Sequence, residues 1–202
     1  MKPILYYIHD PMCSWCWGFK TTWDAMCERL EGSVEIRYVL GGLAAESHTP
    51  MPMDMRESLE QTWQSVSEKT GARFNHDFWR SNTPMRSTYP ACKAVLLARD
   101  AGKEREMITA IQQCYYQQAG NPSIYDQLSL LAEGLDMDVK GFQQSIQSEI
   151  LNQRLQEEIM FAESLGAQGF PSLVLEVDGQ RTFISHSYTD IEENLKRIQH
   201  YL

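Results

Sequence analysis

Two cysteines near the amino terminus, Cys13 and Cys16, stand between a predicted strand and a predicted helix. The segment 3–8 is rich in β-branched and aromatic residues, and apolar residues recur at helical spacing between 17 and 30. A second strand is predicted over 34–40, and strands joined through a helix in this way are parallel, with a right-handed crossover. The chain is therefore restricted to α/β folds that carry a cysteine pair at the start of a helix.

The spacing of this pair predicts a redox site. On the first turn of a helix, two cysteines separated by two residues have both sulfur atoms on one face, close enough to form a disulfide. The first sulfur also lies near the free backbone N–H groups and the positive end of the helix dipole, which favour the thiolate. Because the thiolate attacks disulfides, we expect Cys13 to be the nucleophile and Cys16 to resolve the mixed disulfide.

The pair has two other interpretations, a structural pair of thiols or half of a zinc site. Zinc usually takes four ligands, and the sequence contains neither a second Cys-x-x-Cys motif nor a pair of histidines at ligand spacing. We therefore expect no metal and no organic cofactor. Cys92 and Cys114 fall inside predicted helices, and whether they form a disulfide stays open.

Helices are predicted through the middle of the chain, where no strand pattern occurs. Apolar residues at helical spacing and turn residues place these helices at 54–70, 90–101, 104–118, 123–134, 138–147 and 149–165. Two strands follow at 172–177 and 181–185, joined by Asp178-Gly179, which is a strong hairpin signal.

Capping boxes are predicted at the starts of two helices. One is formed by Asp54 and Glu57, and the other by Thr189 and Glu192, ahead of a last helix that begins near Asp190.

The composition of the chain excludes several classes of function. The net charge of -9, with 27 acidic against 18 basic residues, argues against binding to nucleic acid or to an anionic membrane surface. Hydrophobic residues make up 43% of the chain without a run long enough to span a bilayer. Five cysteines, an odd number, argue against a structural disulfide framework, and the apolar run at the start is too short for a signal peptide. We expect a cytoplasmic protein with reduced thiols.

Two motifs, in this order and spacing, give the chain a resemblance to the DsbA-like branch of the thioredoxin superfamily, nearest to the cytoplasmic FrnE-type group of predicted disulfide isomerases. They are Asp10-Pro11-Met12-Cys13-Ser14-Trp15-Cys16-Trp17-Gly18-Phe19 and Gly169-Phe170-Pro171-Ser172. The resemblance covers nearly the whole chain. It implies a thioredoxin-fold domain formed by 1–42 and 166–202, and an inserted all-helical domain at 43–165 whose last helix, about 149–165, packs on the thioredoxin sheet.

The activity implied by this resemblance is thiol-disulfide exchange on protein or small thiol substrates, as a reductase, an oxidase or an isomerase. Glutathione is a candidate thiol partner. Pro171 would be the cis-proline that faces the cysteine pair, and Phe170 would expose its backbone to an extended substrate. Trp15 would form an aromatic rim for apolar substrates. The alternative for Pro171 is that it merely begins an edge strand.

The motif departs from DsbA and thioredoxin at two positions. Trp15 stands where DsbA has a histidine, so a lowered but not extreme pKa is expected for Cys13. Tyr7 stands where both relatives carry a buried carboxylate, so His9 and Asp10 become the candidate proton acceptors for the pair. The alternative, to which we give equal weight, is that Asp10 caps the turn and His9 is only packed in the core.

Kappa-type glutathione transferases and 2-hydroxychromene-2-carboxylate isomerases share the expected architecture, and they form the main rival interpretation. They typically carry serine at the position of Cys13 and have no need of Cys16, so the two cysteines favour redox chemistry. A chaperone or metal-handling role is the third interpretation, and it would not require the cysteine pair.

Overall fold

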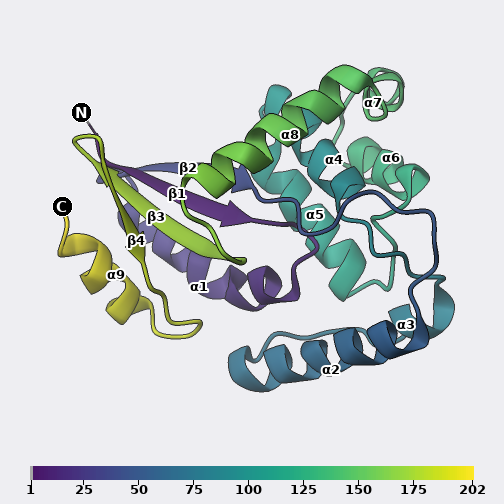
Figure 1. Ribbon diagram of the computed structural model, residues 1–202, viewed down its shortest axis with the longest axis horizontal. Coiled ribbons are helices and arrows are strands. Elements are labelled where there is room, and N and C mark those ends of the chain that lie inside the picture. Colours follow the sequence, from purple (N-terminus) through teal and green to yellow (C-terminus); the bar gives the residue numbers. More distant parts are fainter. Residues whose placement is uncertain (1) are drawn as a thin grey trace.

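A computed structural model describes residues 2–202, with a four-stranded sheet beside a block of helices (Figure 1). The strands are β1 (Ile4–His9), β2 (Glu35–Leu40), β3 (Ser172–Val177) and β4 (Gln180–Ile184). The helices are α1 (Ser14–Leu30), α2 (Met53–Thr70), α3 (Phe78–Ser81), α4 (Tyr89–Asp100), α5 (Glu104–Tyr116), α6 (Tyr125–Gly134), α7 (Val139–Ser145), α8 (Glu149–Ser164) and α9 (Ile191–Gln199). No helix among the described residues is both long enough and apolar enough to cross a membrane.

The sheet has the order β2-β1-β3-β4, with β1 parallel to β2 and antiparallel to β3. The predicted parallel pair is therefore confirmed. β3 and β4 form the predicted hairpin, in which Asp178 and Gly179 both have positive φ angles of 49° and 81°. Two such residues match the twist of antiparallel strands, which explains why an Asp-Gly pair closes this turn.

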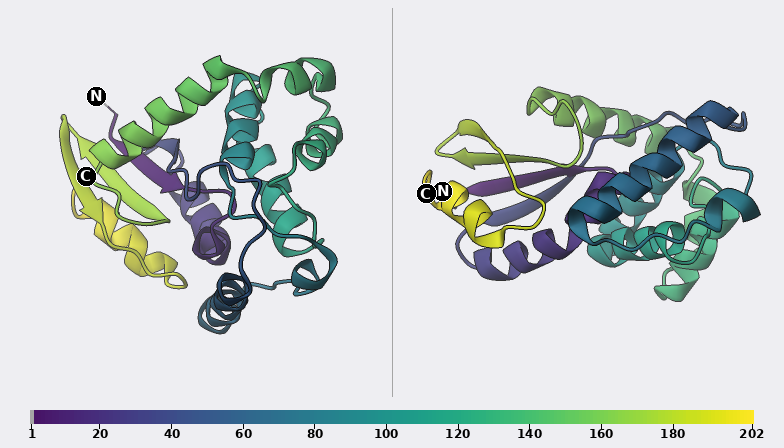
Figure 2. Two further views of the ribbon diagram at one scale, coloured as in Figure 1. Left: turned by 45° about the vertical axis from the view of Figure 1, so that its right-hand side comes forward. Right: turned by 90° about the horizontal axis from the view of Figure 1, so that it is seen from below.

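Helices cover both faces of the sheet, so β1 is buried on both sides. Leu5 and Tyr7 pack beneath α1 and α9, whereas Tyr6 and Ile8 point toward α8. Figure 2 shows the same arrangement, with α8 on one face and α1 and α9 on the other. Because both faces are covered, the apolar residues of β1 are consecutive rather than alternating.

Helix α4 lies at the centre of the helical block, and most of its residues are buried. An ion-pair network joins it to the sheet. The Arg99 guanidinium donates to both carboxylate oxygens of Glu158 on α8, at 2.6 and 2.7 Å, and Glu158 accepts from the Leu40 backbone N–H at 2.8 Å. These bonds hold α4 and α8 against the end of β2, next to the segment that carries the cysteine pair.

This architecture is the α/β thioredoxin fold with inserted helices that the sequence predicts. The division into domains at 42/43 and 165/166 stays a prediction. Ala162 of α8 and Leu165 just after it pack with β1 and β3, while Leu151 and Leu155 of the same helix belong to the core around α4. One helix thus contributes to the core around α4 and to the core between itself and the sheet.

Three local predictions are wrong. The sequence does not predict helix α3, because a single helical turn is too short to show apolar periodicity. Asp54 does not cap α2, since the helix starts one residue earlier and Pro52 is its N-cap, which leaves Asp54 within the first turn. At α9 the cap is Asp190, which accepts from the Glu193 N–H at 2.9 Å, one residue later than the predicted Thr189 box.

Candidate active site

Cys13 is the N-cap residue of α1. Its backbone is extended, with φ -82° and ψ 120°, and the helix begins at Ser14. A tight turn leads into it from β1, because the Cys13 N–H donates to the Asp10 carbonyl at 3.0 Å. The Cys13 side chain is 6% exposed and that of Cys16, one turn inside the helix, is 0% exposed. The two cysteines therefore lie where the sequence places them, with Cys13 the more accessible.

The environments of the two sulfur atoms push their pKa values apart. The pKa of Cys13 is lowered, first by a hydrogen bond from the Cys16 thiol and then by the backbone N–H groups of Cys16 and Trp15, against burial and the negative charge of Asp10. The pKa of Cys16 is raised well above its ordinary value, first by burial and then by the hydrogen bond to Cys13 and its charge. This arrangement favours a thiolate at Cys13 and a thiol at Cys16.

The Phe170–Pro171 segment lies beside Cys13 although 157 residues separate Cys13 from Phe170. The Phe170–Pro171 peptide bond is cis, as the resemblance implies, and the Cys13 thiol donates to the Phe170 carbonyl at 3.5 Å. The Phe170 ring fills the space above Gly41, where a Cβ atom would lie 1.9 Å from the ring. A glycine at the end of β2 is therefore required for the segment to approach the cysteine pair.

Asp10 is completely buried and accepts four hydrogen bonds. The donors are the N–H groups of Met12 at 2.8 Å and Leu43 at 2.7 Å, the Thr88 hydroxyl at 2.7 Å and the Cys92 thiol at 3.4 Å. Burial raises the pKa of the Asp10 carboxyl, and these hydrogen bonds oppose that rise. The side chain thus joins the loop before Cys13 to the segment after β2 and to the start of α4.

His9 is also completely buried, but its imidazole makes no hydrogen bond within residues 2–202. Its ring stacks on Tyr7 at 5.1 Å and meets the edge of Tyr38 at 5.7 Å. Burial, followed by the charge of Arg99, lowers the pKa of His9 to about 3. The imidazole is therefore neutral near pH 7 and a weak base, so the geometry favours its packed interpretation.

A groove of about 460 Å³ opens at Cys13, and we call it the front groove. Its lining is largely apolar and comes from the motif, α2, the segment before α4 and the Phe170 loop; six of its residues are Cys13, Trp15, Met51, Trp63, Arg86 and Phe170. The half-buried Trp15 ring packs against Tyr188 at 5.1 Å, and Lys69 Nζ lies 5.5 Å from the Trp15 ring centroid. The predicted rim residue therefore lines the groove that leads to Cys13.

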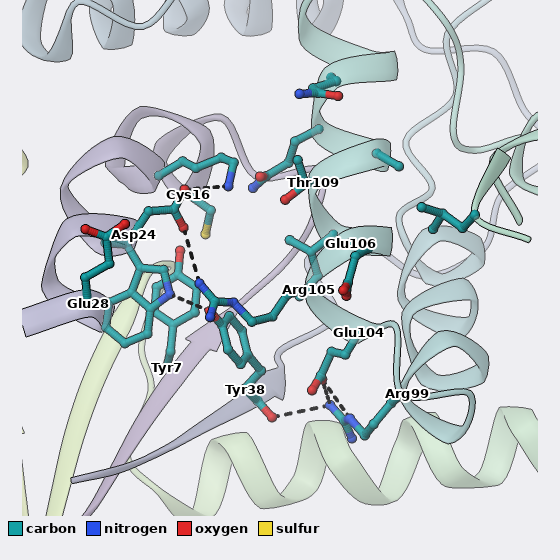
Figure 3. A pocket seen from close by; sticks show the side chains of 18 residues that line it. Tyr7, Cys16, Asp24, Glu28, Tyr38, Arg99, Glu104, Arg105, Glu106 and Thr109 are labelled. Carbon is teal, nitrogen blue, oxygen red and sulfur yellow. Dashed lines mark hydrogen bonds and ion pairs between the residues drawn. The ribbon is translucent and has the colours of Figure 1, made fainter. Parts of the chain in front are cut away.

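A second cavity, of about 890 Å³, reaches Cys16 and Tyr7, and we call it the rear cavity (Figure 3). Charged side chains of two helices line it: Lys20, Asp24 and Glu28 from α1, and Glu104, Arg105 and Glu106 from α5. Sequence reasoning missed this cavity. The sequence does indicate the α1 wall of the cavity, since the three charged residues on α1 recur at intervals of four and therefore share one helix face.

Tyr7 lines the rear cavity. It occupies the position at which, by the resemblance, a buried carboxylate would be expected. It is buried and stacks on Trp23 at 4.2 Å. Burial, followed by the charge of Cys16, raises the pKa of Tyr7 well above its ordinary value, so the hydroxyl stays protonated. Tyr7 therefore supplies a neutral hydroxyl near Cys16 rather than a carboxylate.

All five cysteines are free thiols, so Cys92 and Cys114 are not joined. Burial raises the pKa of both Cys27 and Cys114 to about 11, and burial also raises that of Cys92. Among the described residues, no three His, Cys, Asp or Glu side chains are grouped as a metal site would need. Of the five thiols, Cys13 alone has a lowered pKa.

Comparison with known proteins finds a thioredoxin family model and similar solved structures. A family model described as thioredoxin matches residues 6–193. A protein from Nitrosomonas europaea, described as a candidate protein disulfide isomerase, is 28% identical with a TM-score of 0.86, and the match covers 100% of this chain and 98% of that one. None of the curated proteins matches this chain.

Two structures of the cytosolic disulfide reductase DsbM from Pseudomonas aeruginosa share the fold with TM-scores of 0.80. One is 24% identical and covers 98% of this chain and 97% of that one; the other, with GSH, is 22% identical and covers 98% and 100%. A 2-hydroxychromene-2-carboxylate isomerase shares the fold at 13% identity and a TM-score of 0.65, covering 89% and 87%. The chain shares its fold with these structures, and because the family model matches residues 6–193, it belongs to the thioredoxin family.

Proposed function

We propose that the protein is a thiol-disulfide oxidoreductase in which Cys13 attacks and Cys16 resolves. The observation that carries this proposal is the opposite direction of the two pKa shifts at the start of α1, next to the Phe170 carbonyl. The relatives described as a disulfide reductase and a candidate disulfide isomerase support the same class of reaction.

The reaction proceeds by two exchanges. The Cys13 thiolate attacks one sulfur of a substrate disulfide, a bond forms between them, and the other substrate sulfur leaves as a thiolate. Cys16 then loses its proton and attacks the Cys13 sulfur, which releases the second substrate thiolate and leaves a Cys13–Cys16 disulfide. Two electrons pass from the pair to the substrate, and a thiol partner returns the pair to its reduced form. Running the steps in reverse oxidises a dithiol.

The Phe170–Pro171 segment provides the docking edge for the substrate in this proposal. The Phe170 carbonyl, next to Cys13, accepts a backbone N–H of an extended substrate, and Pro171 has no N–H of its own to compete. Trp15 offers an aromatic surface at the same groove. A substrate held between them presents its disulfide to Cys13.

Asp10, rather than His9, is the proton acceptor that we assign to Cys16. It is a buried carboxylate whose pKa is raised by burial, and its charge raises the pKa of both cysteines, which indicates that it lies within electrostatic reach of each. A carboxyl group whose pKa is raised by burial exchanges protons near neutral pH more readily than a carboxyl group with an ordinary pKa. His9, with a pKa of about 3, lacks that property.

A cytoplasmic location and glutathione as the reducing thiol complete the proposal. Both are supported by DsbM, which is described as cytosolic and was solved with GSH. In such a location the pair works as a reductase or isomerase, because the surrounding thiol pool keeps it largely reduced.

The test is to trap the mixed disulfide. A Cys16→Ser variant incubated with a peptide disulfide should accumulate a covalent adduct, and peptide mapping by mass spectrometry should place that adduct on Cys13. The Cys13→Ser variant serves as the matched control and should form none at this position. Absence of the adduct from the Cys16→Ser protein would show that Cys13 is not the attacking residue.

Glutathione-dependent transfer or isomerisation is the alternative, and the fold shared with the isomerase is its support. A Cys16→Ala variant separates the two functions. With no other thiol present, its reaction with a disulfide should stop at the Cys13 mixed disulfide, because no second cysteine resolves it. An isomerase that activates bound glutathione without Cys16 would keep its turnover of a small-molecule substrate.

A further inference from the structure

Arg86 lies in the front groove as a cation without a partner. It lines the same groove as Cys13 and is half-buried, in the segment between α3 and α4. Within residues 2–202 its guanidinium forms no ion pair and no hydrogen bond, whereas eight of the eleven arginines pair with a carboxylate. In a chain with a net charge of -9, an unpaired arginine in the groove that reaches Cys13 indicates a site for an anionic ligand.

The backbone that carries Arg86 is fixed in place by the two residues that follow. Thr88 donates its N–H to the Ala44 carbonyl at 2.9 Å and its hydroxyl to Asp10 at 2.7 Å. The Ser87 carbonyl accepts from the Ser123 hydroxyl at 2.7 Å. Because Asp10 also holds the loop before Cys13, these bonds hold the Arg86 segment and the nucleophile in one framework.

The surroundings of Arg86 favour the binding of an anion, and of a carboxylate in particular. The groove around it is lined mainly by apolar side chains such as Met51 and Trp63, which give a guanidinium little solvation. Glu163 also lines the groove, but it is exposed to solvent, where its charge is better screened than that of half-buried Arg86. A planar guanidinium pairs with a carboxylate through two parallel hydrogen bonds, which is the chemistry best matched to this position.

We propose that Arg86 binds a substrate carboxylate placed close to the scissile disulfide, so that the site prefers acidic thiols and disulfides. This inference rests on the proposed function, since it concerns the substrate of Cys13. The carboxylate belongs either to a small thiol such as glutathione or to an acidic residue beside a cystine in a peptide. Arg86 orients that disulfide toward Cys13, and the bond changes are those of the exchange already described.

The test compares disulfides that differ in charge. Wild-type protein and an Arg86→Gln variant are mixed with dithiodipropionic acid, which carries carboxylates, and with neutral hydroxyethyl disulfide, and the rate of the first exchange at Cys13 is measured. The ratio of the acidic to the neutral rate should fall about tenfold in Arg86→Gln, the range expected for losing one charge-assisted hydrogen-bonded pair. An unchanged ratio would overturn the inference. Reaction of neither disulfide with wild-type protein would instead refute the proposed function.

Two controls separate binding from structure. Arg73→Gln removes another arginine that forms no ion pair among the described residues and does not line the groove, and it should keep the wild-type ratio. Arg86→Lys retains the charge and should restore part of the preference. In wild-type protein, added salt should slow the acidic disulfide more than the neutral one, and this measurement needs no variant at all. Equal slowing of both would contradict the proposal.

Two further substrates identify the source of the carboxylate. Glutathione disulfide is compared with a peptide disulfide flanked by glutamates, each against a neutral analogue. Dependence on Arg86 for glutathione disulfide alone assigns the site to small thiols, and dependence for the peptide alone assigns it to protein substrates. If neither shows dependence on Arg86, the carboxylate preference is refuted.

Discussion

The front groove and the rear cavity meet the same Cys-x-x-Cys motif but differ in chemistry. The front groove is mainly apolar, contains Arg86 and reaches Cys13, whereas the rear cavity is lined by charges of α1 and α5 and reaches Cys16. The difference fits the two roles that we propose for one helix turn. Cys13, the proposed nucleophile, opens toward the mainly apolar groove, and Cys16, the proposed resolving thiol, is protonated and completely buried.

The charge of Asp10 acts on both cysteines, and its replacement should have the largest effect. In Asp10→Asn the buried negative charge disappears, so the pKa of both cysteines should fall, because that charge raises each of them. The second exchange should slow by about a hundredfold, since proton acceptors contribute factors of this size. Dithiodipyridine reports both steps, as each exchange releases one equivalent of thiopyridone.

A purely structural role for Asp10 gives a different result. Loss of its hydrogen bonds would lower the free energy of unfolding by about 1–3 kcal/mol and leave the rate of the second exchange close to that of the wild-type protein. A Thr88→Val variant removes one donor but keeps the charge, and it serves as the matched control. If this variant slows the second exchange as much as Asp10→Asn does, Asp10 is not the proton acceptor.

Gly41 tests the front region alone. In Gly41→Ala the new methyl group overlaps the Phe170 ring, so the Phe170–Pro171 segment must move away from Cys13. We expect an unfolding free energy lower by about 1–3 kcal/mol, measured in urea, and a first exchange slower by about tenfold or more. Gly134→Ala adds a methyl group where nothing lies within 4 Å, and it should neither lower the unfolding free energy nor slow the first exchange. An unaltered first exchange in Gly41→Ala would show that the segment does not position the substrate.

Arg105 tests the rear region and should give the smallest effect. Its side chain is 59% exposed and lies 4.0 Å from Asp24 across the cavity, where solvent screens the pair. Arg105→Gln should change the first exchange less than about twofold, with no selectivity between acidic and neutral disulfides. The same substitution at Arg86 should change that selectivity. If the two variants behaved alike, the distinction between the front and rear regions would be wrong.

Local patterns were enough to predict most of the fold and the centre of the site. The strand, helix and strand around Cys13 follow from apolar spacing, and the Asp178-Gly179 turn follows from the residues that tolerate positive φ. The cis peptide bond before Pro171 and its position beside Cys13 came only from the resemblance, since nothing local relates segments so far apart.

Other features depend on packing that a sequence does not display. The rear cavity exists because α5 faces α1, and the lack of a partner for Arg86 depends on how the segments around the front groove pack together. The burial of His9 did have a signal. His9 alternates with Leu5 and Tyr7 along β1, which places it on the same covered face of the sheet.

The most direct test of the central claim is the pH dependence of alkylation in the reduced wild-type protein. Iodoacetamide labelling from about pH 4 to pH 10, quantified by peptide mass spectrometry, reports the thiolate fraction of each cysteine separately. The account predicts that Cys13 is labelled first, with a midpoint below the ordinary cysteine pKa, while Cys16 stays protected until far higher pH. Labelling of Cys16 before or together with Cys13, or a Cys13 midpoint at or above the ordinary value, would contradict it.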